Sequence, residues 1–169
     1  MTPLPAALGG REVVAWRLDL AEYAKTWDSG EGAYIYGGRW SCAGVRAVYC
    51  SIDPSTSILE LAVHKGFEAL DTVPHILTSL SINDPKSICV VSPEEMPNPN
   101  WLHSGSPSAG QQKFGDALLV KHKVILIPST VSRHSWNLIF LGGQAAKPYA
   151  LKAQERFALD TRLHLPQRS

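Results

Sequence analysis

Hydrophobic residues recur along this chain in short runs that predict β-strands. The first run, Val13–Leu18, reads VVAWRL, and Arg46–Cys50, RAVYC, is of the same kind. Five later runs also predict strands: His75–Ile82, Ser87–Val91, Val124–Ser129, Ser135–Leu141 and, in the tail, Phe157–Leu163. The chain is therefore expected to be rich in strands.

Longer stretches with helical spacing lie between these runs. Asp53-Pro54 predicts a helix start, because Asp53 can cap free N–H groups and proline suits the first helical position. Residues 55–70 continue that helix, with an apolar stripe at helical spacing. The stripe comprises Ile58, Leu59, Ala62, Val63 and Phe67. Ala109–Val120 predicts a second helix, and Leu20–Thr26 a short one.

Strands and helices are interspersed without regular βαβ alternation, which predicts an α+β fold rather than a doubly wound sheet. A chain of 169 residues with 44% hydrophobic residues fits one globular domain. No repeat or change in composition divides it, so we expect a single domain over residues 1–169. Residues 1–10, rich in proline, glycine and small side chains, are expected to be a loose lead-in.

Charge and cysteine content narrow the function classes. The formal net charge is +1, so no strong field attracts nucleic acid or an anionic membrane. The three cysteines, Cys42, Cys50 and Cys89, are odd in number and lack zinc-like spacing, so we expect neither disulfides nor a metal site. No signal peptide or membrane-spanning run is recognisable. The sequence predicts a cytoplasmic protein in a reducing compartment.

Familiar catalytic motifs are absent from the sequence. There is no P-loop, no GxGxxG opening a helix, no HExxH and no GxSxG. The sequence therefore lacks the main support for a nucleotide kinase, a Rossmann dehydrogenase, a zinc protease or a serine hydrolase. Five glycines occur between Gly30 and Gly44. Such density indicates unusual backbone torsions or a close approach to a ligand.

Two arginines stand out by their surroundings. Arg17 lies between Trp16 and Leu18 in an apolar run, and Arg39 follows two glycines. A guanidinium beside a flexible turn is suited to grip a phosphate with two hydrogen bonds. The alternative is that either arginine lies on the surface or pairs with a carboxylate.

Four other polar residues sit where apolar ones are expected. Glu60 is flanked by aliphatic residues, and a partly buried carboxylate of this kind is typical of functional sites; the alternative is a solvated ion pair with Lys65. Tyr49 suits stacking on a flat ring, or else simple core packing. Ser129 suits either an amide ligand or a turn. Asn137 needs a hydrogen-bond partner if it is buried.

In order and approximate spacing, these residues resemble the RES-domain family, which is named for its arginine, glutamate and serine. The resemblance covers nearly the whole chain, and the GGRW block, the Tyr-to-Glu interval and the final FxxDxRL are its most specific parts. The matching segments are Trp16-Arg17, Gly37-Gly38-Arg39-Trp40, Ala47-Val48-Tyr49, Leu59-Glu60, Gln112…Gly115-Asp116, Ile127-Pro128-Ser129, Trp136-Asn137 and Phe157…Leu163. The chain departs from the family pattern at Ser41, commonly asparagine, and at Leu141-Gly142, commonly Asn-Pro.

The resemblance implies an ADP-ribosyltransferase-like fold, with a split, mixed β-sheet core and flanking helices around an NAD⁺ site. It implies that NAD⁺ is a substrate rather than a cofactor and that its nicotinamide–ribose bond is cleaved. Water, phosphate or a protein side chain can then accept the ADP-ribose. It further implies a cognate antitoxin with an Xre-like helix-turn-helix domain, which covers the active-site entrance and provides the contact with DNA.

On this resemblance the catalytic residues are Arg17, Glu60 and Ser129. Glu60 is expected to stabilise the oxocarbenium character of the ribose. Arg17 and Arg39 are expected to hold the diphosphate or the nicotinamide-side ribose, Tyr49 to stack on the nicotinamide ring, and Ser129 to bind near that ring.

Three other functions compete with NAD⁺ degradation. The chain could transfer ADP-ribose to a cellular protein, or it could be a non-catalytic interaction module. The third is a ribonuclease toxin that uses histidines such as His103 or His122, which the near-neutral charge disfavours.

Overall fold

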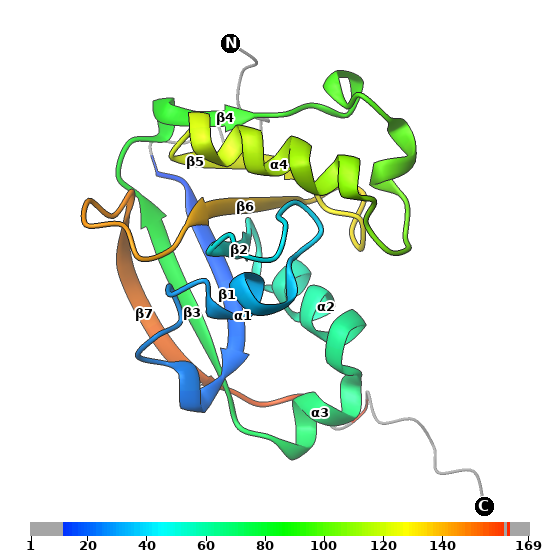
Figure 1. Ribbon diagram of the computed structural model, residues 1–169. Coiled ribbons are helices and arrows are strands. Elements are labelled where there is room, and N and C mark those ends of the chain that lie inside the picture. Colours follow the sequence, from blue (N-terminus) through cyan, green and yellow to red (C-terminus); the bar gives the residue numbers. More distant parts are fainter. Residues whose placement is uncertain (1–11, 161, 163–169) are drawn as a thin grey trace, which may run out of the picture.

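The structure is a computed structural model, and it describes residues 12–160 and 162 (Figure 1). Its centre is a seven-stranded mixed sheet with the strand order β4-β5-β6-β2-β1-β3-β7. The strands are β1 (Val14–Leu20), β2 (Ala47–Ser51), β3 (His75–Ile82), β4 (Ile88–Val90), β5 (Val124–Pro128), β6 (Trp136–Leu141) and β7 (Tyr149–Phe157). The α+β class predicted from the sequence is confirmed.

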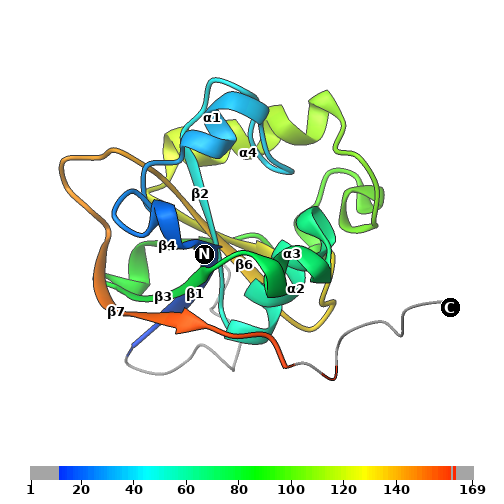
Figure 2. The same ribbon diagram turned by 90° about the horizontal axis from the view of Figure 1, so that it is seen from below.

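Helices cover the sheet in two groups. The α-helices are α1 (Glu31–Tyr36), α2 (Pro54–Lys65), α3 (Phe67–Thr72) and α4 (Ala109–Lys121). Short 3-10 helices lie in the connections: η2 (Ala21–Tyr23), η3 (Pro85–Ser87), η4 (Pro93–Glu95) and η5 (Pro99–Leu102). Figure 2 shows α1 and α4 on one side of the molecule and α2 with α3 on another. No helix of the described residues is both long and apolar enough to cross a membrane.

The sheet is nearly divided between β1 and β2. Strand β1 pairs with β3 along its whole length, from Val14 to Leu20, and β2 pairs with β6 from Ala47 to Ser51. Between β1 and β2 the register contains the single pair Trp16↔Ser51. All pairings are antiparallel except β4 with β5. The sheet therefore consists of two halves joined at one point.

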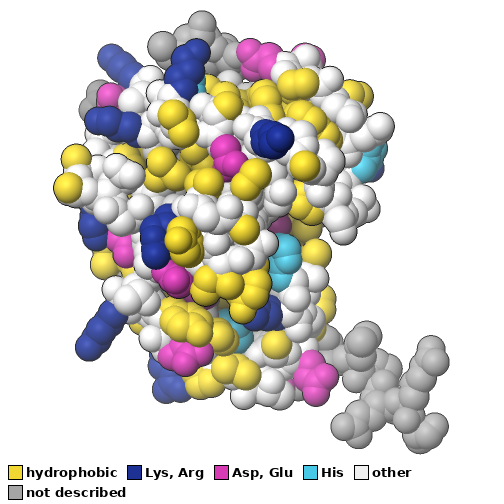
Figure 3. Space-filling view, viewed as in Figure 1, with side chains coloured by type: hydrophobic (Ala, Val, Ile, Leu, Met, Phe, Trp, Pro, Cys, Tyr) yellow, Lys and Arg dark blue, Asp and Glu magenta, His cyan; other side chains and the backbone are white. Residues whose placement is uncertain are grey.

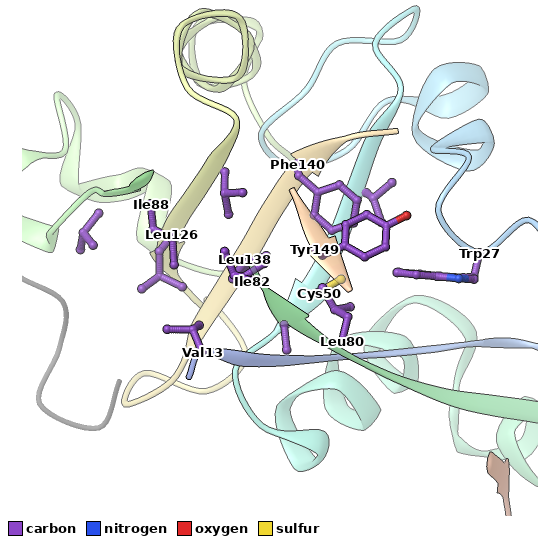
Figure 4. Packing of buried hydrophobic residues seen from close by; sticks show 14 residues of the cluster. Val13, Trp27, Cys50, Leu80, Ile82, Ile88, Leu126, Leu138, Phe140 and Tyr149 are labelled. Atoms are coloured by element: carbon purple, nitrogen blue, oxygen red, sulfur yellow. The ribbon is translucent and has the colours of Figure 1, made fainter. Parts of the chain in front are cut away.

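The two halves share a core because the sheet curls around one of its faces. One buried cluster contains Ile82 of β3 together with Ile88 and Leu126 of β4 and β5, although these strands are far apart in the sheet order. In Figure 4 this cluster extends from Ile88 and Leu126 at one end, through Leu138 and Ile82, to Phe140, Tyr149 and Trp27 at the other. Burial of this apolar surface stabilises the curl.

Helix α2 begins where the sequence predicts. The Asp53 side chain accepts a hydrogen bond from the Thr56 N–H at 2.8 Å, and Pro54 occupies the first turn. The helix ends at Gly66, whose φ is 81°. Residues 67–72 therefore form the separate helix α3 instead of continuing α2.

The predicted apolar stripe of α2 is partly wrong. Leu59 and Val63 are exposed, and Phe67 lies beyond the end of the helix. Instead, Ile58, Leu61 and Ala62 pack in the core. The first turn of α2 also buries Thr56 and Ser57 against the sheet, so polar contacts help to choose which face turns inward.

Other differences from the predicted elements have local causes. The last strand is Tyr149–Phe157 rather than Phe157–Leu163; it is an edge strand whose side chains are mostly exposed, so it lacks the expected hydrophobic pattern. The predicted helix at 20–26 is reduced to η2, and α1 forms inside the glycine-rich segment. The predicted lead-in at 1–10 and the end of the predicted 157–163 strand lie outside the described residues.

Candidate active site at the sheet split

The split is a break in the hydrogen-bond ladder that side chains fill. If the register of Trp16↔Ser51 continued, Leu18 would face Tyr49 across the strands. Instead, the Leu18 N–H donates to Ser57 Oγ of α2 at 2.9 Å, and Arg17 Nη1 donates to the Tyr49 carbonyl at 2.9 Å. Both backbone groups are thus satisfied without pairing with each other. At the opening, Ser57 of α2 satisfies the backbone of β1, and Arg17 satisfies the backbone of β2.

Arg17 is oriented by a carboxylate two residues further along β1. Its Nε and Nη2 donate to Asp19 Oδ2 at 3.0 and 2.6 Å. The side chains of Arg17 and Asp19 are 27% and 19% exposed, so the pair lies at the edge of the interior. A guanidinium carries five N–H donors, and these contacts use three of them. Arg17 therefore pairs with a carboxylate, as the sequence allowed, and keeps donors for an anion.

Glu60 is tied to the sheet rather than to its own helix. Its Oε1 accepts hydrogen bonds from Ser129 Oγ at 2.9 Å and from Asn137 Nδ2 at 2.6 Å. The ion pair with Lys65 is not among those formed by the described residues. Ser129 follows β5 and Asn137 lies in β6, so two neighbouring strands hold this carboxylate.

Ser129 is both a turn serine and a ligand of Glu60. Its Oγ accepts from the N–H groups of Val131 and Ser132, each at 3.2 Å. A hydroxyl has one proton to donate and two acceptor positions. With both acceptor positions used by the turn, the proton is directed at Glu60.

Tyr49 connects the split to the GGRW turn. Its hydroxyl accepts from the Trp40 N–H at 3.0 Å and lies 2.8 Å from Ser41 Oγ. Burial raises the pKa of Tyr49 to about 12, because the phenolate would lose its hydration. A Cβ on Gly38 would come within 2.4 Å of this hydroxyl, so glycine is needed there. Ser41, one of the positions where the chain departs from the RES-domain pattern, therefore contacts Tyr49 directly.

Arg39 faces a different segment from Arg17. Its guanidinium donates to the carbonyls of His103 at 3.3 Å and Gly105 at 2.8 Å, just after η5. In Figure 3 the part of the molecule around η5 projects beyond α2. The structure thus joins Arg17 to the Tyr49 carbonyl at the split and joins Glu60 to Ser129 and Asn137, and it engages Arg39 with this projecting segment.

One face of α4 holds the GGRW turn in place. Gln112 Nε2 donates to the Gly38 carbonyl at 2.9 Å, and both Asp116 carboxylate oxygens lie 3.2 Å from the Cys42 nitrogen. Between them, a Cβ on Gly115 would lie 2.0 Å from the Trp40 carbonyl oxygen. These residues share one helix face by their i, i+3 and i+4 spacing. This accounts for the sequence pattern that the chain carries at 112–116.

Sequence reasoning missed three residues of this arrangement. Asp19 lies two positions from Arg17, a spacing that places both on one face of a strand. Ser51 bonds to Asn137, and Ser57 bonds across to β1, and neither contact leaves a local signal in the sequence. Only the pairing of distant strands brings them to the site.

Elsewhere among the described residues, neither a hollow nor a cluster of metal-ligating side chains offers an alternative catalytic centre. A hollow of about 360 Å³ lies after α4, where Lys121, His122 and Lys123 line it together with Lys147. Its lysines make this hollow cationic, but it is lined by none of the five residues expected from the sequence to act on or bind NAD⁺, which are Arg17, Arg39, Tyr49, Glu60 and Ser129. The described residues do not bring three His, Cys, Asp or Glu side chains together as metal ligands.

Comparisons with known proteins place this geometry in context. Residues 14–165 match the family model described as the RES domain. A protein called "Toxin Res" from Photorhabdus laumondii is 31% identical over 130 residues, covering 75% of this chain and 80% of the relative. A second "Toxin Res", from Yersinia enterocolitica, is 28% identical over 156 residues, covering 89% of this chain and 99% of the relative.

A solved structure shares the fold. It is the M. tuberculosis MbcT–MbcA toxin–antitoxin complex, of which one chain matches with a TM-score of 0.70 at 17% identity. The match covers 87% of this chain and 85% of that chain. At this identity the likeness concerns the arrangement of the elements.

Proposed function

Because this chain belongs to the RES-domain family, we propose that it is the toxin of a bacterial toxin–antitoxin pair and that it degrades NAD⁺ by cleaving the nicotinamide–ribose bond. The observation that carries the proposal is the anchoring of Glu60 by one oxygen. Ser129 and Asn137 bind its Oε1, and Arg17, at the split between β1 and β2, keeps N–H donors that its own contacts do not use.

The bond that breaks joins ribose C1′ to the nicotinamide nitrogen. Its electron pair leaves with the ring, which is cationic in NAD⁺ and becomes neutral, so no acid is needed to protonate the leaving group. Positive charge then develops on the ribose as an oxocarbenium ion. Glu60 lies beneath that charge, where a well-placed electrostatic partner accelerates the reaction roughly 100- to 1000-fold.

Arg17 binds the anionic part of the substrate. Asp19 and the Tyr49 carbonyl fix the plane of its guanidinium, and the remaining N–H groups bind the diphosphate. The ring of Tyr49 forms a wall beside the nicotinamide. Ser129 acts through Glu60, to which it donates its proton. Arg39 uses two of its five N–H donors on the carbonyls of His103 and Gly105, and its remaining donors bind the diphosphate.

The acceptor completes the reaction. Water that adds to C1′ gives ADP-ribose and releases one proton, whereas inorganic phosphate gives the 1″-phosphorylated product. In both cases nicotinamide is released. The partner in this proposal is an antitoxin with an Xre-like DNA-binding domain that covers the entrance. The fold shared with a toxin–antitoxin complex supports such a partner.

The test is a purified-protein assay with NAD⁺, with and without phosphate, read by the masses of the products. We expect free nicotinamide together with ADP-ribose or its phosphorylated form, and growth arrest when the protein is expressed without an antitoxin. Glu60→Gln should lower kcat roughly 100- to 1000-fold. Glu68→Gln, on an exposed position of α3, is the matched control and should leave kcat unchanged.

Intact NAD⁺ in the presence of folded wild-type protein would overturn the proposal. ADP-ribose attached to a cellular protein, with little free product, would instead show a transferase. Near-normal kcat in Glu60→Gln would remove Glu60 from its assigned role.

A further inference from the structure

A buried chain of hydrogen bonds leads from β2 through β6 to Glu60. Ser51 Oγ donates to Asn137 Oδ1 at 3.1 Å, and Asn137 Nδ2 donates to Glu60 Oε1 at 2.6 Å. Ser51 is 2% exposed and Asn137 is 8% exposed. The two residues are direct partners in the register of β2 and β6, so the pairing of these strands sets their relation.

The direction of these hydrogen bonds follows from the chemistry of Glu60 and Ser51, the residues at the two ends of the series. An ionised carboxylate only accepts hydrogen bonds, so the amide must turn its nitrogen toward Glu60. Its oxygen then faces Ser51, which can donate. An aspartate at position 137 would have the same shape but would present an oxygen to Glu60, so this contact depends on the amide nitrogen.

The two oxygens of Glu60 have different surroundings. Oε1 receives both donors, from Ser129 after β5 and from Asn137 in β6. None of the described residues forms a hydrogen bond with Oε2. Two donors from two strands fix the position of Oε1 and the plane of the carboxylate more tightly than one donor could, because a single bond leaves the side chain free to pivot.

We propose that Asn137, supported by Ser51, is a positioning residue that orients Glu60 and presents Oε2 to the ribose of the substrate. This inference rests on the proposed function. Asn137 acts through Glu60 and does not bind NAD⁺, so its loss should change the rate of bond cleavage and not the affinity for NAD⁺.

The kinetic test uses Asn137→Asp, which keeps the shape of the side chain but replaces the donor to Glu60 with an acceptor. We expect kcat to fall about 100-fold, the loss that a displacement of about 1 Å can cause. KM should stay within roughly threefold of wild type, since Arg17 is unaffected. Ser51→Ala should lower kcat less, because the amide loses only its support.

The matched control is Asn83→Asp, whose amide donates to the Lys147 carbonyl at 3.2 Å, away from the split. It should keep wild-type kcat and KM. Circular dichroism establishes that each variant is folded, and Asn137→Ser replaces Asn137→Asp if the latter does not fold. Wild-type kcat in a folded Asn137 variant, or a change confined to KM, would overturn the inference.

A second readout does not depend on turnover. The side-chain amide signal of Asn137 in a ¹⁵N–¹H NMR spectrum is identified by its loss in an Asn137 variant. We expect this signal to shift in Glu60→Gln and to stay in place in Glu68→Gln. An unmoved signal in an enzyme that still degrades NAD⁺ would overturn the positioning role alone. Wild-type protein that leaves NAD⁺ intact would overturn the proposed function and this role with it.

Discussion

Removing the Ser57 hydroxyl should weaken the fold by an amount that the structure allows us to work out. Ser57 is 6% exposed and accepts the buried Leu18 N–H at 2.9 Å. Ser57→Ala leaves that N–H without a partner, which costs about 1–3 kcal/mol of unfolding free energy. Alanine is a better helix former than serine by about 0.5 kcal/mol, so the net loss should be about 0.5–2.5 kcal/mol.

The assay is thermal unfolding. In a chain of this length, each kcal/mol lowers Tm by about 2–4 °C, so we expect a fall of about 1–10 °C. Ser55→Ala is the matched control, because Ser55 is an exposed serine in the first turn of the same helix. It gains helix propensity and loses no buried contact, so its Tm should not fall.

Equal Tm values in Ser57→Ala and Ser55→Ala would refute the reasoning. That result would mean that the Leu18 N–H finds another partner, such as the Tyr49 carbonyl, and that Ser57 does not hold the split. A closed ladder would also displace Arg17 from that carbonyl, and KM for NAD⁺ would then rise.

Two further predictions concern the GGRW turn. The pKa of Tyr49 is raised from about 10 in the unfolded chain to about 12 in the fold, so its contribution to stability is complete below pH 10 and is lost as pH rises through 12. Tyr49→Phe should be less stable than wild type at pH 8 but should lose less stability between pH 10 and 12, as measured by urea unfolding; parallel declines would contradict this. Gly115→Ala places a Cβ 2.0 Å from the Trp40 carbonyl oxygen, so it should lower the unfolding free energy by at least about 1–3 kcal/mol. Gly32→Ala, where a Cβ has open space, is its control and should not be destabilised; equal stability of the two variants would refute the close packing of α4.

The candidate residues could be found from sequence because they interrupt local patterns. Arg17 interrupts an apolar strand, Glu60 an aliphatic run, and Asn137 a strand whose neighbours are buried. Polar residues in such places must have partners, so the pattern indicates a site before any partner is known. The partners themselves depend on the register of strands far apart in sequence. This is why Ser57 could not be assigned to Leu18.

The errors in the predicted elements also arise from contacts between residues that are far apart in the sequence. A hydrophobic pattern predicts which side chains are buried only where apolar contacts cause the burial. In α2 the inner face is set partly by Ser57 and Glu60, and at β7 an edge strand needs little burial at all. The helix α1 was missed because two glycines, at 30 and 32, mask its helical composition.

The split explains why the site is built from these residue types. Opening a sheet between two central strands exposes backbone donors and acceptors, and each one left unpaired in the interior costs about 1–3 kcal/mol. A serine supplies an acceptor for the Leu18 N–H, and an arginine supplies a donor for the Tyr49 carbonyl. Of the two, only the arginine has N–H groups left after the backbone is satisfied. Arg17 can therefore keep the sheet open and bind an anion in the opening at once. A loss of NAD⁺ binding in Arg17→Ala would therefore combine two effects, and measuring its Tm beside that of Ser57→Ala separates the structural share from the loss of the binding group.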